Sequence, residues 1–258
     1  MGRESAPTRR TELRSLGTAT LTGTNGDDLR AVLTQPKRLG LLAYMAVAKP
    51  RGFQRRDTLL ALFWPELDRS SARRSLRQAL HALRATLGAQ AVVSRGLEEV
   101  ALADDEVWCD AVAFEAAIEE RRFAEAVRLY HGDFLRGLHA TDAPAFERWC
   151  EHERARLREL AYDAGLMLAT LALRDRGPRA AVRWARWCYD LEPDEETALG
   201  DLMRILSMVG DRAEALRAYD EFAERLWRER GVRPSAETRR LRELVMISAE
   251  LGLEASVE

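Results

Sequence analysis

Residues 69–88, RSSARRSLRQALHALRATLG, predict a single helix that carries five arginines and no acidic residue. Asp68 or Ser70 can cap its start, and Gly88 stands where a helix commonly ends. Five apolar residues fall on one face at helical spacing: Ala72, Leu76, Leu80, Leu83 and Leu87. The segment is therefore expected to bury an apolar face and to present a cationic face to its surroundings.

This helix is the third of three predicted in a row. Pro36 can begin the first helix, since proline costs least in a first turn, and residues 49–52, KPRG, end it. Residues 55–63 predict a second, shorter helix, and the sequence Trp-Pro at 64–65 ends it. After the third helix, residues 91–94 and 98–103 predict a β-hairpin. Three helices and a hairpin in this order indicate a winged helix-turn-helix, in which the third helix enters the DNA major groove.

Short strands are expected before the first helix. Residues 1–11 resemble a polar, disordered tail, and residues 12–34 contain alternating segments around a turn at Asn25-Gly26, the last of them LRAVLT at 29–34. Residues 107–110 either form one more strand or begin a linker. We therefore place an α+β DNA-binding domain at residues 12–110.

From residue 111 onward the pattern is helical. The pattern Ala-apolar-Arg recurs at residues 126–128, 181–183 and 215–217, and the last two copies are 34 residues apart. This is the period of tetratricopeptide helix pairs. We therefore predict a tetratricopeptide-like, all-α domain over residues 111–250, which makes the whole chain mainly α.

Charge is distributed unevenly along the chain. The 258 residues have a net charge of −2, yet residues 1–110 hold 17 Lys and Arg against 13 Asp and Glu. The remaining residues hold 23 basic and 29 acidic side chains. A cationic half joined to an anionic half suggests two roles. The absence of a long apolar run and of an apolar N-terminal region predicts a cytoplasmic protein without a membrane span.

The arginine helix has two interpretations. A solvated charged face is common, but such faces usually mix charge signs because Glu–Arg pairs one turn apart stabilise a helix. Here Arg73 and Arg77 repel each other with no acid nearby, which suggests that an external polyanion neutralises them. Arginine can pair with guanine and glutamine with adenine in the major groove. DNA is therefore the expected partner.

The outward-facing residues divide into two sets by their position. We expect base contacts from the side chains opposite the apolar face: Arg74, Arg77, Gln78 and His81. We expect phosphate contacts from side chains at the edges and on neighbouring elements: Arg55, Arg73, Arg84 and Arg95, with Arg56 and Lys37 as secondary candidates. Glu98 and Glu99 in the hairpin are unfavourable next to phosphates.

Several stretches resemble a known family. Residues 41–88, LLAYMAVAKPRGFQRRDTLLALFWPELDRSSARRSLRQALHALRATLG, resemble the DNA-binding half of bacterial regulators of the Streptomyces antibiotic regulatory protein (SARP) type. Residues 123–138, FAEAVRLYHGDFLRGL, residues 142–159 and residues 191–238 resemble the bacterial transcriptional activator domain that follows it. The resemblance implies promoter binding, often at direct repeats, and recruitment of RNA polymerase. It matches the recognition-helix motif to residues 73–84 and the wing to residues 94–100.

We therefore predict a sequence-specific regulator, an activator that binds promoter DNA through residues 70–87. Its helical domain would recruit RNA polymerase or a second copy, and a homodimer is left open. The alternative is a tetratricopeptide-type adaptor without specific DNA binding. The histidines lack metal-ligand spacing, and no phosphate-binding loop or nucleophile motif is present. We expect no catalytic site, metal or cofactor, and a cytoplasmic, nucleoid-associated location.

Overall fold

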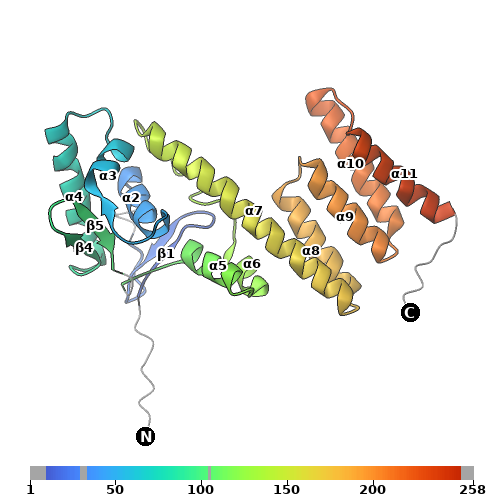
Figure 1. Ribbon diagram of the computed structural model, residues 1–258, viewed down its shortest axis with the longest axis horizontal. Coiled ribbons are helices and arrows are strands. Elements are labelled where there is room, and N and C mark those ends of the chain that lie inside the picture. Colours follow the sequence, from blue (N-terminus) through green and yellow to red (C-terminus); the bar gives the residue numbers. More distant parts are fainter. Residues whose placement is uncertain (1–9, 30–33, 104–105, 251–258) are drawn as a thin grey trace, which may run out of the picture. The chain divides into compact units, whose positions relative to one another are not determined.

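The computed structural model describes residues 10–29, 34–103 and 106–250, and helices make up most of them (Figure 1). The chain divides into two compact units, Met1–Glu159 and Leu160–Glu258. Of the predicted tail, residues 1–9 lie outside the described residues, and Thr11 already begins the first strand. Most of the predicted strand at residues 29–34 also lies outside them.

A small sheet opens the first unit. β1 (Thr11–Arg14) pairs antiparallel with β2 (Thr20–Thr22) and parallel with β6 (Val107–Cys109), in the order β2-β1-β6. Of the two interpretations of residues 107–110, the strand is therefore the correct one. Asp110, directly after β6, is buried and accepts hydrogen bonds from the backbone amides of Ser15 (2.7 Å) and Leu16 (3.0 Å). Asp110 is also the first residue of the next helix, α5 (Asp110–Glu119), so these hydrogen bonds hold the residues after β1 against the start of that helix.

The predicted three helices and hairpin follow one another as expected. The helices are α2 (Pro36–Val47), α3 (Arg56–Phe63) and α4 (Arg69–Leu87), and the hairpin strands are β4 (Val92–Arg95) and β5 (Glu99–Leu102). A short strand that the sequence did not indicate, β3 (Gln54–Arg55), pairs with β5, giving the order β3-β5-β4. The predicted fold class is confirmed: the chain is mainly α, with an N-terminal winged helix-turn-helix followed by a helical region.

The helical region begins with α5 (Asp110–Glu119), α6 (Phe123–Leu129) and the long α7 (Pro144–Arg174). The first half of α7 packs against the helix-turn-helix through aromatic rings. Phe146 lies 4.6 Å from Phe63 and Trp149 lies 4.7 Å from Tyr44, measured between ring centroids. Gly40 on α2 makes this approach possible, because an added Cβ would lie 2.7 Å from the Phe146 ring.

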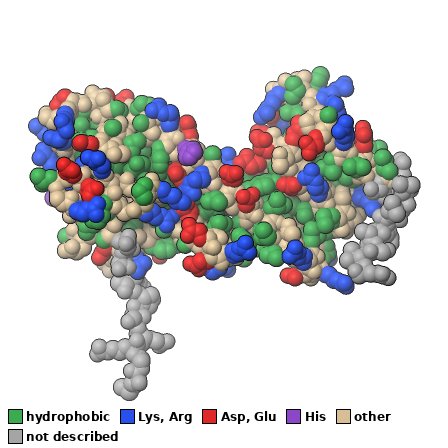
Figure 2. Space-filling model, in the orientation of Figure 1, with side chains coloured by type: hydrophobic (Ala, Val, Ile, Leu, Met, Phe, Trp, Pro, Cys, Tyr) green, Lys and Arg blue, Asp and Glu red, His purple; other side chains and the backbone are tan. Residues whose placement is uncertain are grey.

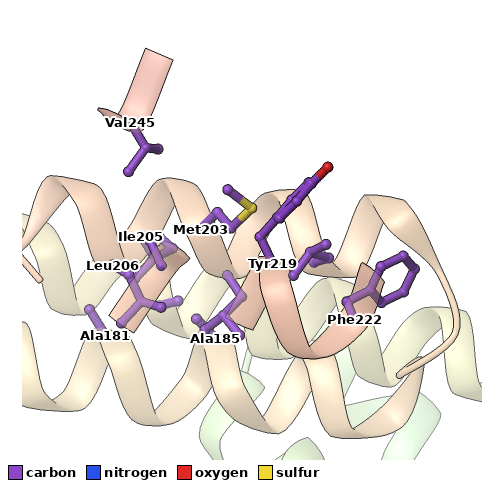
Figure 3. Close-up of a cluster of buried hydrophobic side chains, with 12 residues drawn as sticks. Ala181, Ala185, Met203, Ile205, Leu206, Tyr219, Phe222 and Val245 are labelled. Carbon is purple, nitrogen blue, oxygen red and sulfur yellow. The ribbon is translucent and has the colours of Figure 1, made fainter. Parts of the chain in front are cut away.

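The second unit consists of the end of α7 and four further helices, α8 (Pro178–Leu191), α9 (Glu196–Met208), α10 (Arg212–Arg230) and α11 (Ala236–Glu250). Consecutive helices pack against each other, and α8 and α10 begin 34 residues apart, at the predicted repeat spacing. Figure 3 shows their shared core, where Ala181 and Ala185 of α8 face Met203 and Leu206 of α9. Ala181 and Ala215, the alanines of the two pattern copies that are 34 residues apart, are both fully buried in this core.

Candidate nucleic-acid interface

α4 begins and ends where local chemistry predicts. The Asp68 carboxylate accepts hydrogen bonds from the amides of Ser70 (2.9 Å) and Ser71 (3.1 Å), which have no partner within the helix. At the other end Gly88 has φ +110°, and its amide donates to the carbonyl of Arg84 (3.0 Å). Of the two predicted caps, Asp68 is therefore the N-cap, and the helix spans 19 residues.

The predicted division of α4 into two faces is confirmed. The five residues of the predicted apolar stripe are all buried, together with Ala79. On the opposite side the predicted base-contacting residues are all exposed: Arg74, Arg77, Gln78 and His81. Figure 2 shows Lys and Arg side chains gathered over the part of the molecule that α4 and the hairpin form. The helix thus presents its polar side chains outward from the first unit.

The arginines of this face carry little compensating charge. Arg69 lies 3.7 Å from the Asp57 carboxylate of α3, a contact between two exposed side chains. Arg73, Arg74 and Arg77 make no ion pair with any carboxylate among the described residues. These three neighbouring arginines are therefore exposed and have no anionic partner in the described part of this unit.

The hairpin that flanks α4 has an exposed tip. Gly96 has φ +59°, a left-handed conformation that suits glycine, and the next side chain, Leu97, is 93% exposed. Arg95 donates to the Glu99 carboxylate (2.6 Å) across the hairpin and lies over the ring of Phe53. The hydrogen bond from Arg95 lowers the pKa of Glu99. The ion pair neutralises Glu99, one of the two hairpin carboxylates expected to be unfavourable next to phosphates. It also means that the charge of Arg95 is already compensated, which the sequence did not indicate.

A groove of roughly 680 Å³ lies between α3, α4 and the hairpin tip. It brings together four of the main candidates from the sequence: Arg55, Arg73, Arg77 and Arg84. Gln78 instead lines a separate hollow of roughly 450 Å³ with residues of α2, and Lys37 in that hollow is paired with Glu66 (3.0 Å). The groove therefore holds three phosphate candidates together with the base candidate Arg77, whereas the base candidate Gln78 lies on another surface.

Arg84 and Arg56 differ from the other candidate arginines of the interface in being half-buried. The Nε of Arg84 donates to the carbonyl of Val92 (2.9 Å), and its Nη2 reaches the hydroxyl of Ser94 (3.2 Å). Arg56, a secondary candidate from the sequence, also lines the groove and reaches the same hydroxyl. No local pattern signals this contact, since Arg56 and Ser94 are 38 residues apart.

The described residues contain no group of three or more His, Cys, Asp or Glu side chains placed to hold a metal ion. All three cysteines are buried and unpaired. Among the helices that the structure describes, none is long and apolar enough to cross a membrane.

A winged helix-turn-helix with an exposed cationic third helix defines a class of DNA-binding regulators, and the sequence comparisons narrow the class to a family. Residues 109–246 match the family described as the bacterial transcriptional activator domain, and this match covers more than half of the 258 residues. The chain belongs to this family. No curated protein matches the sequence.

A solved structure has a similar fold. Mycobacterium tuberculosis EmbR, in complex with a low-affinity phosphopeptide, is similar to this chain with a TM-score of 0.65 and 21% sequence identity. The alignment covers 93% of this chain and 65% of the EmbR chain, so the chain spans less than two thirds of that relative. The family match confirms the predicted resemblance to SARP-type regulators, and the similarity to EmbR shows that the fold is shared.

Proposed function

We propose that this regulator binds promoter DNA sequence-specifically by placing α4 in the major groove. The observation that carries the proposal is the exposed cationic face of α4, on which Arg73, Arg74 and Arg77 have no ion-pair partner among the described residues. Arginines one turn apart repel each other, and a helix in solution is more stable with mixed charges. Phosphates of a duplex would supply the missing negative charge and release the ions condensed on them.

The two sets of side chains have separate roles in this proposal. Base-edge contacts come from the centre of the exposed face: Arg74, Arg77, Gln78 and His81. Phosphate contacts come from the groove beside it and from the hairpin: Arg55, Arg73, Arg84 and Arg95. We expect Arg95 to contribute least, because Glu99 already compensates its charge.

The helical region is proposed to hold a partner near the promoter. Its stacked helix pairs, whose 34-residue offset is typical of tetratricopeptide repeats, suit protein contacts. RNA polymerase or a second copy of the chain would then be concentrated at the promoter without any chemical step, which makes the protein an activator. We also propose that the DNA-binding domain spans residues 12–110 and the helical domain residues 111–250. A regulator that binds promoter DNA would lie in the cytoplasm, associated with the nucleoid.

The test begins with the full chain and a pool of random duplexes, from which bound DNA is selected and sequenced. Fluorescence anisotropy then measures Kd for a matched and a scrambled duplex over a series of salt concentrations. We expect tighter binding of the matched duplex and a steep loss of affinity as salt rises. A tetratricopeptide-type adaptor would retain no specific DNA at any salt concentration, and that result would overturn the proposal.

A single substitution separates base contact from general attraction. Arg77→Ala is expected to weaken binding to the matched duplex by about 1–3 kcal/mol and to narrow the difference from the scrambled duplex. Arg128→Ala is the matched control, because Arg128 is an exposed arginine of α6 whose Nε donates only to the helix carbonyl of Ala124. Equal losses of affinity for the matched duplex in Arg77→Ala and Arg128→Ala would show that Arg77 acts only through its charge.

A further inference from the structure

Two arginines from different helices meet at the first strand of the hairpin, close to its tip. The Nη2 atoms of Arg56, at the start of α3, and of Arg84, near the end of α4, each lie 3.2 Å from the Oγ atom of Ser94. A second hydrogen bond, from Nε of Arg84 to the carbonyl of Val92, holds that side chain in place. Two positive groups therefore share one neutral hydroxyl, although each could bind an anion more strongly.

Nearby carboxylates do not compensate this pair. The elements around it carry three acidic side chains: Asp57, Glu98 and Glu99. Asp57 is paired with Arg69, and Glu99 is paired with Arg95. Glu98 lines the groove, but no ion pair joins it to either arginine within the described part of the chain. Among the described residues, the positive charge of Arg56 and Arg84 is thus left without an anion.

Arg56 is the less well satisfied of the two. Its Nε atom is buried and has no hydrogen-bond partner. Burial lowers the pKa of Arg56, and the charge of Arg84 lowers it further. Both effects disfavour the charged side chain in the free protein. A buried donor without a partner beside a like charge is unusual in a structural role, and it points to a ligand that supplies acceptors.

We propose that Arg56, Arg84 and Ser94 form an oxyanion site that takes one phosphate group of the bound DNA backbone. The site rests on the proposed function and adds a specific contact to it. A phosphate offers several charged acceptors, and the planar guanidinium groups can approach it from two sides. The groove that opens onto the site is lined by further arginines, which suits a chain of phosphates rather than a single small anion.

This contact also fixes the hairpin relative to the helices. The backbone amide of Arg56 donates to the carbonyl of Glu98 (2.8 Å) in the hairpin, while Arg84 reaches the carbonyl of Val92 in β4. A phosphate held by both guanidinium groups would therefore bridge α3, α4 and the hairpin at once. Without a phosphate, repulsion between the two arginines acts against this arrangement.

The first test is thermal unfolding of the full chain, with Arg56→Gln compared with the matched control Arg128→Gln. In chloride buffer, Arg56→Gln is expected to leave the Tm unchanged or raised, because it removes one of two repelling charges. Inorganic phosphate at constant ionic strength is expected to raise the Tm of the wild type and of the control but not that of Arg56→Gln. A lower Tm of Arg56→Gln in chloride would show that Arg56 is structural and would overturn the site.

The second test measures DNA affinity with the same variants. Arg56→Gln is expected to weaken the matched and the scrambled duplex alike, by about tenfold, and to reduce the slope of log K against log salt by about one. Arg56→Lys keeps the charge and is expected to retain most of the slope. Wild-type affinity and slope in Arg56→Gln would overturn the site while the proposed function stands.

The two proposals can fail separately. If the wild type binds no duplex but the phosphate effect on the Tm still depends on Arg56, the site holds free phosphate and the proposed function is wrong. If the matched duplex is bound but phosphate has no effect and Arg56→Gln changes nothing, the function stands and the site is wrong.

Discussion

Glu115 provides the sharpest test of how the helix-turn-helix is held on the helical region. It lies on α5, its side chain is only 3% exposed, and three cations surround it. Lys49 (2.8 Å) and Arg51 come from the segment after α2, and Arg156 (2.5 Å) comes from α7. The substitution Glu115→Gln keeps the shape of the side chain and removes its charge. We expect it to loosen the attachment of α2 and α3 to α5 and α7.

The size of the effect follows from the exposure of the three cations. The side chain of Arg156 is 25% exposed, whereas those of Arg51 and Lys49 are 39% and 52% exposed. Solvent can compensate for the two more exposed cations, so we allow roughly 0.5 kcal/mol for each of them and about 1 kcal/mol for Arg156. The free energy of unfolding of this unit should fall by about 2 kcal/mol, which corresponds to a decrease in Tm of about 4–8 °C.

The effect should depend on pH in a defined direction. Burial alone would raise the pKa of Glu115, but hydrogen bonds from Lys49 and Arg156 and the charges of Arg156 and Arg51 outweigh it, and the pKa is lowered. A depressed pKa in the folded state stabilises the fold above the pKa of the unfolded chain, which is about 4.3. The difference between wild type and Glu115→Gln should therefore be constant near neutrality and should disappear as pH falls below that value.

Thermal and urea unfolding of both proteins between about pH 3 and pH 8 would measure this difference in stability, because that range spans the titration of Glu115. Glu125→Gln is a suitable control, because Glu125 pairs with Arg122 on an exposed surface of α6 and should contribute little. The reasoning is refuted if the two variants lose equal stability, or if the effect of Glu115→Gln grows as pH falls.

Three further predictions concern packing, capping and thiol reactivity. Gly40→Ala should destabilise the first unit by about 1–3 kcal/mol, since its Cβ would overlap the Phe146 ring, and urea unfolding would measure the loss. Asp68→Ala should speed hydrogen exchange at the first amides of α4, because it removes the carboxylate that accepts hydrogen bonds from the amides of Ser70 and Ser71. The less ordered start of the helix should also weaken DNA binding. Burial raises the pKa of Cys150 and Cys188 to about 12, so both thiols should resist alkylation near neutral pH until the protein unfolds, as mass spectrometry would show.

The sequence predicts most of the helix-turn-helix because its signals are local. The limits of α4 depend on Asp68 and Gly88, which act within one turn of the helix ends. The hairpin strands, expected at 91–94 and 98–103, lie at Val92–Arg95 and Glu99–Leu102 because alternation and the turn at Gly96 define them. In each case the residues that decide the structure are close neighbours in the chain.

Contacts between distant segments were not predictable in this way. β3 has only two residues and exists because β5 pairs with it, so no run of alternation indicates it. Glu115 meets Arg51 and Arg156 across 64 and 41 residues, and Arg56 meets Ser94 across 38. These pairs require knowledge of how helices and hairpin lie together, which periodicity does not contain. The contact between Arg56 and Ser94, which distinguishes the candidate site, can therefore be found only in the folded structure.

The contrast between two sets of arginines in the first unit strengthens the case for DNA binding. On α7, two arginines are accompanied by acids: Arg156 meets both Glu153 and Glu115, and Arg158 meets Asp133 (2.8 Å). The first 110 residues contain 13 acidic residues, so carboxylates are not scarce there, yet none occurs between residues 69 and 97. This acid-free stretch covers α4 and the first half of the hairpin, and a second one, residues 29–56, covers α2 and β3. Arg73, Arg74 and Arg77 are exposed and repel one another with no ion pair among the described residues, and a partner that supplies negative charge best explains this arrangement.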